Sequence, residues 1–321
     1  MAQPLLARLR EKRPDIKVDL LAPEWVAPVA RRMPEVDEVI TTRFRHGALN
    51  LRRRWQLGRT LRARRYRQAI VLPNSWKAAL VPFFADIPLR SGYVGESRYG
   101  LLNLLYRRGD RAMREHYARL AEAPGTEPAA PLPRPRLRVD PAQAAATRAR
   151  FGLNSGYVVL CPGAEYGPAK RWPYFAELAA RLGKPVVLLG SPNDVATAAG
   201  IEGKNLVGGT TLDEAIEIIA GAELVVSNDS GLMHVAAALG RPLIALFGSS
   251  SPDKTPPQPG RVRVLWGVGD DSSFRPADLL IGEIGRVVGN LDLHRIPAAG
   301  HWSAYENAAE INRLMLEFFS S

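Results

Sequence analysis

Short apolar runs alternate with amphipathic stretches through the second half of the chain. Runs that are apolar at every position are typical of parallel strands covered on both faces. The stretches between them repeat apolar residues at helical spacing. The pattern therefore predicts a Rossmann-like α/β domain. We expect strands at 157–161, 185–189, 224–227 and 242–247, and helices at 172–182, 212–220 and 232–239.

The first half shows the same alternation but opens with a helix. An amphipathic helix is expected over 5–13 and a strand over 18–21, whereas an α/β domain usually begins with a strand. A proline-rich stretch between 122 and 141 is typical of a linker. Two Rossmann-like domains are therefore predicted. The alternation continues through 27–33, 38–40, 51–66 and 68–72, and the expected boundaries are 1–122 (first domain), 123–150 (linker and lead-in helix), 151–261 (second domain) and 262–321 (tail).

Length and composition agree with this organisation. At roughly 100–200 residues per domain, 321 residues predict two domains. No run approaches the ~20 apolar residues of a spanning helix, and the N-terminus lacks the apolar core of a signal peptide. We therefore expect neither an integral membrane protein nor a Sec-exported one. The single cysteine, Cys161, excludes a disulfide framework and a cysteine-built zinc site and is consistent with a reducing cytoplasm.

Charge is distributed unequally. Residues 1–150 carry 30 Lys and Arg against 14 Asp and Glu, whereas the remainder carries 13 against 18. A basic half favours a polyanionic partner such as nucleic acid, anionic lipid or a phosphorylated glycan. A solvated helix face is the alternative for most of these side chains. The densest cluster consists of Arg43, Arg45, Arg52, Arg53, Arg54, Arg59, Arg62, Arg64 and Arg65.

Two loops carry candidate chemistry, and the first spans 161–173, between an expected strand and an expected helix. Gly163 and Gly167 allow the backbone to approach a ligand closely. Lys170 and Arg171 supply positive charge, so the loop is suited to a phosphate. An ordinary turn with two solvated cations is the alternative.

The second loop, 227–234, also runs from a strand into a helix. Asp229 or Ser230 can cap that helix, and its first backbone N–H groups, from Ser230, Gly231 and Leu232, can bind an anion. His234 lies about one turn further in. Any helix N-terminus favours such residues, so the motif alone is weakly specific.

Together the loops lie at the carboxyl ends of strands in one parallel sheet, where doubly wound folds bind nucleotides. Neither loop has the glycine pattern of a dinucleotide site or of a P-loop. A diphosphate held by a helix N-terminus and a lysine is typical of a nucleotide-sugar donor. In such a transfer the protein mainly stabilises the leaving diphosphate and positions the acceptor.

Eight strings of the sequence carry a resemblance to a known family, at 20–25, 32–36, 71–75, 79–84, 98–103, 161–173, 228–234 and 250–256. Together they resemble the lipopolysaccharide heptosyltransferase II group of glycosyltransferase family 9. The resemblance implies a GT-B fold, with ADP-L-glycero-D-manno-heptose as donor and a lipid A inner-core heptose as acceptor. It places Lys170, Asp229, Ser230, Gly231 and His234 at the donor's diphosphate and sugar, and Asp194 and Leu212 near its ribose and adenine. For the acceptor, Asn74, Ser75 and Lys77 are the candidates, because they follow an expected strand.

The resemblance also implies cellular context. We expect a cytoplasmic enzyme, peripheral at the inner face of the inner membrane of a Gram-negative bacterium, where the acceptor is anchored. We expect no metal or other cofactor and no nucleic-acid partner. We expect the protein to be a monomer.

Two departures from the family stand out. Family members begin with a strand and a turn whose aspartate is the proposed general base, and neither is present before the opening helix. Losing a general base typically costs ~10²–10⁴ in rate. We therefore expect weak or absent transfer by this chain, which an upstream strand and aspartate should restore.

The second departure is the end of the chain. From Val262 onward the sequence resembles the C-terminal part of an α/β-hydrolase, in which Asp270 and His301 match the acid and base of a triad. No G-x-S-x-G nucleophile elbow is present, so we expect this pair to be inert and the tail to extend the second sheet. The alternatives are an α/β-hydrolase, a basic nucleic-acid or membrane-surface binder, and a donor-binding relic without turnover.

Overall fold

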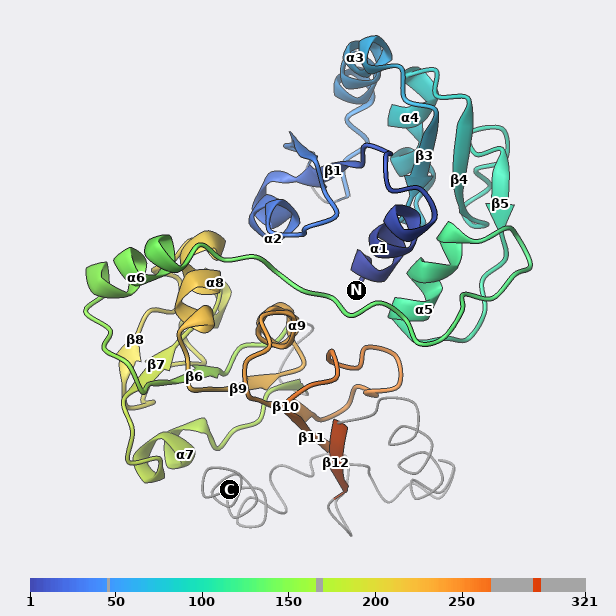
Figure 1. The fold of residues 1–321 in the computed structure, drawn as a ribbon. Coiled ribbons are helices and arrows are strands. Elements are labelled where there is room, and N and C mark those ends of the chain that lie inside the picture. Colours follow the sequence, from blue (N-terminus) through green and yellow to red (C-terminus); the bar gives the residue numbers. More distant parts are fainter. Residues whose placement is uncertain (45–46, 166–169, 267–290, 296–321) are drawn as a thin grey trace. The chain divides into compact units, whose positions relative to one another are not determined.

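The computed structural model describes residues 1–44, 47–165, 170–266 and 291–295. The chain divides into two units (Figure 1). The first comprises Met1–Ala30 and Glu35–Pro133, and the second Arg31–Pro34 and Arg134–Ser321.

The first unit is built from short parallel strands and helices. The strands described there form two separate sheets, β1-β2 and β3-β4-β5, and every pairing is parallel. The opening helix is confirmed, with Leu5 and Leu6 buried. Its elements are α1 (Gln3–Lys12), β1 (Asp19–Pro23), η1 (Glu24–Val26), α2 (Ala27–Arg31), β2 (Glu38–Thr42), α3 (Leu51–Leu61), η2 (Arg62–Arg64), β3 (Gln68–Val71), η3 (Trp76–Ala79), α4 (Leu80–Phe84), β4 (Leu89–Tyr93), β5 (Leu104–Tyr106), α5 (Met113–Ala118) and η4 (Arg119–Ala121).

The second unit holds one larger parallel sheet. Its strand order is β12-β11-β10-β9-β6-β7-β8, so the chain moves outward from β6 to β8, returns, and continues from β9 on the other side. This is the strand order of a Rossmann-type doubly wound fold. The elements are α6 (Pro141–Arg150), β6 (Val158–Cys161), α7 (Phe175–Arg181), β7 (Val186–Leu188), η6 (Pro192–Asp194), β8 (Lys204–Asn205), α8 (Leu212–Ala220), β9 (Leu224–Asn228), α9 (Gly231–Ala238), β10 (Leu243–Phe247), β11 (Val262–Trp266) and β12 (Leu291–Arg295).

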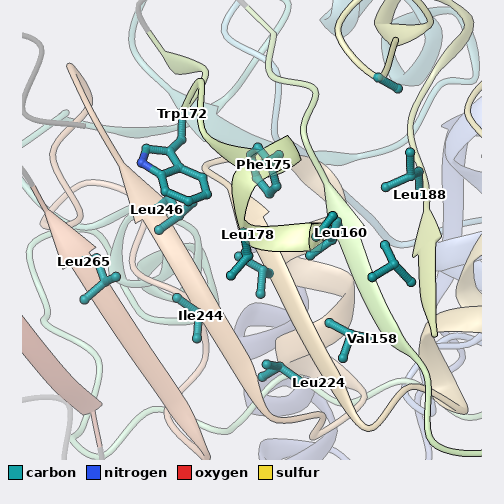
Figure 2. Close-up of a cluster of buried hydrophobic side chains, with 14 residues drawn as sticks. Val158, Leu160, Trp172, Phe175, Leu178, Leu188, Leu224, Ile244, Leu246 and Leu265 are labelled. Atoms are coloured by element: carbon teal, nitrogen blue, oxygen red, sulfur yellow. The ribbon is translucent and has the colours of Figure 1, made fainter. Parts of the chain in front are cut away.

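The core of the second unit explains why its strands are uniformly apolar. Strands β6, β9 and β10 are buried at every position. On one face of the sheet, side chains such as Leu160 and Ile244 pack against Trp172 and Phe175, which precede and open α7 (Figure 2). Burying a large side chain of this kind stabilises a fold by ~1.5–3 kcal/mol, so this cluster holds the loop after β6 against the sheet.

One predicted boundary is wrong. The helix expected over 172–182 begins only at Phe175. Trp172 is instead buried in the core, where its ring centroid lies 5.2 Å from that of Phe175. Its backbone N–H donates a hydrogen bond to the side chain of Asn228 and not to a helix carbonyl oxygen. Pro173 therefore precedes the helix rather than lying in its first turn.

The end of the chain is described only in part. Strands β11 and β12 extend the sheet in parallel register beyond β10. Asp270 and His301 lie outside the described residues. Among the helices that the structure describes, none is long and apolar enough to cross a membrane.

Candidate functional site

The loops that follow β6 and β9 meet at the centre of the second sheet. These strands pair directly, with Cys161 opposite Ser227, although β7 and β8 intervene in the chain. Ligands of doubly wound sheets bind outside the carboxyl ends of the strands, where the strand order reverses. The two predicted loops therefore lie where this fold binds ligands.

A fully buried asparagine joins these loops. The Asn228 side-chain amide donates a hydrogen bond from Nδ2 to the carbonyl oxygen of Pro162, at 2.8 Å. Its Oδ1 accepts one from the backbone N–H of Trp172, at 3.1 Å. Both partners belong to the first loop. Asn228 thus fixes the spacing between the loops, a role that sequence reasoning missed, although an amide at the end of an apolar strand was a usable signal.

Lys170 and Asp229, both predicted at the donor site, form an ion pair across the two loops. The distance from Lys170 Nζ to Asp229 Oδ2 is 2.6 Å. The side chain of Asp229 is only 9% exposed and that of Lys170 22%, so water screens the pair incompletely. Gly167, predicted to let the backbone approach a ligand, lies outside the described residues. The structure therefore brings a cation and a carboxylate together at the strand ends.

The N-terminus of α9 lies directly after this pair. Ser230 occupies the N-cap position, but its side chain makes no capping bond to the helix. Its hydroxyl instead lies 3.1 Å from that of Ser227. A Cβ placed on Gly231 would meet no atom within 4 Å among the described residues. The first N–H groups of a helix have no partner within it, so this helix end can hold an anion.

His234, the remaining residue predicted on this motif, lies in the first turns of α9 and is half-buried. His234 therefore lies near the start of α9 at Gly231, about one turn further along the helix.

Asp194 lies beside the same strand ends. Its Oδ2 accepts hydrogen bonds from the backbone and hydroxyl of Ser191, at 2.9 and 2.6 Å. A Cβ on Gly163 would stand only 2.2–2.5 Å from the Asp194 carboxyl group. Glycine at 163 therefore allows that carboxyl group to lie against the loop after β6. Leu212, the other predicted nucleoside contact, is the half-buried first residue of α8.

The cysteine at the end of β6 is an unreactive, buried thiol. Complete burial raises the pKa of the Cys161 thiol to about 12, against a smaller opposing effect of its hydrogen bond with Ser227. Only the thiolate is a good nucleophile or metal ligand. Among the described residues, moreover, no group of three or more His, Cys, Asp and Glu side chains could hold a metal ion.

The predicted acceptor residues Asn74, Ser75 and Lys77 follow β3 in the first unit, at the carboxyl end of its strand. Asn74 and Lys77 are half-buried, and Asn74 Oδ1 is shielded from solvent without a hydrogen-bond partner among the described residues. An unsatisfied buried acceptor of this kind costs free energy unless a ligand or water supplies a donor.

Two buried arginines hold this segment in place. Arg98 is 1% exposed, and its guanidinium donates to the carbonyl oxygens of Pro73, at 2.5 Å, and of Tyr93. Arg54 donates to the carbonyl oxygen of Lys77, at 3.1 Å. Burial lowers the pKa of both guanidinium groups. In the sequence, Arg54 and Arg98 look like ordinary members of a basic half, and no pattern there predicted a structural role for either.

Comparison with known proteins identifies the family. The profile described as "Glycosyltransferase family 9 (heptosyltransferase)" matches residues 54–275. This chain belongs to glycosyltransferase family 9. The match runs past Val262 and includes Asp270, so the family extends further along the chain than the predicted boundary.

Relatives within the family are similar over most of their length. The chain is 46% identical over 290 residues to "Lipopolysaccharide heptosyltransferase 2" of Escherichia coli (strain K12), covering 83% of each chain. It is 41% identical to "Lipooligosaccharide heptosyltransferase 2" of Haemophilus influenzae, over 83% of this chain and 84% of that one. The structure of E. coli ADP-heptose LPS heptosyltransferase II matches with a TM-score of 0.77 and 37% identity, over 98% of this chain and 95% of that chain.

These findings confirm the predicted fold class. The chain has the α/β GT-B fold of this family, built from Rossmann-like units with parallel sheets. They also confirm that it is a glycosyltransferase of the heptosyltransferase family.

Proposed function

We propose that this protein transfers L-glycero-D-manno-heptose from ADP-heptose to the inner-core heptose of lipopolysaccharide. The observation that carries the proposal is the Lys170–Asp229 pair beside the open N-terminus of α9, at the point where the strand order reverses. The names of its relatives, which are heptosyltransferases, supply the sugar and the acceptor.

The diphosphate belongs at the α9 end. Backbone N–H groups of Ser230, Gly231 and Leu232 and the ammonium group of Lys170 would face its negative charge. As the glycosidic bond breaks, that charge grows on the leaving ADP, so these donors stabilise the transition state more than the bound donor.

Asp229 has a different part. A carboxylate is repelled by a diphosphate but accepts hydrogen bonds from sugar hydroxyls, so we assign Asp229 to the heptose. In the free protein it pairs with Lys170. Donor binding would turn Lys170 towards phosphate, and His234 would line the same site.

The nucleoside would extend towards Asp194 and Leu212. Asp194 uses Oδ2 to bind Ser191, and we assign its other oxygen to a ribose hydroxyl. Leu212, at the start of α8, would supply an apolar surface for the adenine.

The acceptor would bind the first unit at Asn74, Ser75 and Lys77. Its hydroxyl oxygen forms a bond to the anomeric carbon, the bond from that carbon to the diphosphate breaks with its electron pair on ADP, and the hydroxyl proton passes to water. Because this acceptor is built on lipid A, we place the enzyme at the cytoplasmic face of the inner membrane as a peripheral monomer. We expect no metal cofactor and no nucleic acid partner.

A transfer assay tests the proposal. ADP release from ADP-heptose is measured with the inner-core acceptor, for wild type, Lys170→Ala and a matched control, Lys184→Ala. Lys184 also pairs with an acidic residue, Glu223, but on the exposed surface of the second unit. We expect Lys170→Ala to lose about tenfold or more in rate, since a charge-assisted hydrogen bond contributes ~1.5–3 kcal/mol, and Lys184→Ala to match wild type. Because the general-base aspartate of the family is missing, wild-type transfer is expected to be slow, so the affinity for ADP-heptose is measured for the same three proteins. Equal affinities, or equal rates above background, would refute the assignment.

A further inference from the structure

The structure sorts the arginine cluster of the first unit into buried, paired and free side chains. Arg54 is buried, Arg43 pairs with Glu24, and Arg64 pairs with Glu38. Arg62 donates to a backbone carbonyl oxygen, and Arg45 lies outside the described residues. Exposed side chains without an acidic partner in the described part of the chain remain at Arg52, Arg53, Arg59 and Arg65.

Three of these arginines, Arg52, Arg53 and Arg59, belong to α3, which also exposes large apolar side chains. Leu51, Trp55 and Arg59 follow one another at i, i+4 spacing and therefore form a row along the helix. Leu51 and Trp55 are each 48% exposed. The Arg59 guanidinium lies 5.9 Å from the centroid of the Trp55 ring. We call Leu51, Arg52, Arg53, Trp55 and Arg59 the α3 patch.

The opposite face of α3 is packed firmly against the first unit. Leu61 is buried and Leu57 half-buried in a cluster that includes Val81 of α4. A Cβ on Gly58 would stand 2.5 Å from Cβ of Phe84, so α3 and α4 cross in close contact. The helix is therefore held in place, and the α3 patch is a preformed surface.

The α3 patch also lies next to the candidate acceptor segment. The buried guanidinium of Arg54, on the inner side of the same helix, donates to the carbonyl oxygens of Leu49, at 2.7 Å, and Lys77, at 3.1 Å. Lys77 belongs to the segment assigned to the acceptor. A surface that binds the α3 patch would thus lie within reach of that segment.

We propose that the α3 patch docks on an anionic phospholipid surface. No acidic residue occurs between Leu51 and Arg65, so no carboxylate of this segment offsets the charge of its arginines. Arginine guanidinium groups bind lipid phosphates, and an indole ring settles at the headgroup level of a bilayer. A basic helix with exposed Trp and Leu combines both contributions, as interfacial helices do. The inference rests on the proposed function for its purpose, which is to bring a lipid-anchored acceptor to the first unit.

Co-sedimentation with vesicles tests this proposal on the full chain. The vesicles contain phosphatidylcholine with or without 30% phosphatidylglycerol (about one lipid in three), at low salt. The triple variant Arg52→Glu, Arg53→Glu, Arg59→Glu is compared with a control of equal net charge, Arg134→Glu, Arg138→Glu, Arg261→Glu. The control residues are exposed and belong to the second unit.

Each arginine near an anionic surface raises the partition coefficient about fivefold, so we expect the α3 triple variant to bind about 100-fold more weakly. The control variant should bind vesicles nearly as tightly as wild type. Its only loss of affinity should be the small one that comes from the change in net charge. Trp55→Ala should also bind more weakly than wild type, and the difference should be larger at high salt, where electrostatic attraction is screened. Quenching of tryptophan fluorescence by brominated lipids should fall in Trp55→Phe.

Equal binding by wild type and the α3 triple variant would overturn the proposal, as would equal loss in the α3 and control variants. Tight salt-sensitive binding to duplex DNA that needs the same arginines, without vesicle binding, would overturn it in favour of nucleic acid. The donor site is tested separately. The α3 triple variant should retain ADP binding, and Lys170→Ala should retain vesicle binding, so either proposal can fail while the other holds.

Discussion

Replacing Asn228 by alanine should loosen both loops of the donor site. The side chain is fully buried, and its amide satisfies the carbonyl oxygen of Pro162 and the N–H of Trp172. The variant leaves one buried acceptor and one buried donor without partners. Each orphaned group costs ~1–3 kcal/mol, so we expect the free energy of unfolding to fall by about 2–5 kcal/mol.

Urea unfolding measures this loss. With a slope of roughly 2–3 kcal/mol per M, the midpoint should fall by about 1 M or more. Asn205→Ala is the matched control, because Asn205 also accepts a backbone hydrogen bond, from Val207, but on an exposed strand. Its unfolding free energy should change by less than about 1 kcal/mol.

Asn228→Asp distinguishes the effect of the hydrogen bonds from that of side-chain size, because aspartate and asparagine are nearly equal in size. Aspartate retains the acceptor for Trp172 but presents a carboxylate oxygen to the Pro162 carbonyl oxygen, so it should destabilise at least as much as alanine. If alanine and aspartate at position 228 each cost less than about 0.5 kcal/mol, Asn228 does not hold the loops together and the reasoning fails.

Further predictions concern four other positions. Gly163→Ala should weaken ADP binding about tenfold in a titration, because the new Cβ displaces the Asp194 carboxyl group, whereas Gly209→Ala, where the nearest atom is 3.6 Å away, should not. Because the pKa of Cys161 is raised from 9.0 to about 12, the unfolded chain ionises first, and stability should fall between about pH 9 and 12; urea midpoints for Cys161→Ala should fall less over this range. Arg98→Lys should lower the thermal midpoint by several degrees, since an ammonium group cannot reach the same carbonyl oxygens; an unchanged midpoint would count against its role.

The central strands of the second unit could be predicted closely from the sequence, whereas the edge strand β8 (Lys204–Asn205) was missed. Expected runs at 157–161, 224–227 and 242–247 correspond to β6 (Val158–Cys161), β9 (Leu224–Asn228) and β10 (Leu243–Phe247). Uniform burial makes each residue apolar, so the local pattern carries the information. The proximity of Lys170 and Asp229 could be anticipated as well, because the carboxyl ends of parallel strands share one edge of the sheet, but their ion pair was not predicted.

What could not be predicted depends on contacts distant in sequence. The start of α7 is displaced because Trp172 is bonded to Asn228, 56 residues away. The buried side chains of Arg54 and Arg98 donate hydrogen bonds to carbonyl oxygens more than 20 residues away in sequence. Neither periodicity nor composition distinguishes such arginines from exposed ones, so the sequence suggested a basic surface where the structure places internal supports.

The most direct test of the account is a calorimetric titration of ADP into the full chain, with Lys170→Ala and Asp229→Ala beside Lys184→Ala. We expect wild type and Lys184→Ala to bind ADP, and Lys170→Ala to bind it about tenfold or more weakly. Asp229→Ala should retain ADP binding more than it retains ADP-heptose binding, because its carboxylate is assigned to the sugar. A folded wild-type protein that binds neither ADP nor ADP-heptose would contradict the central claim.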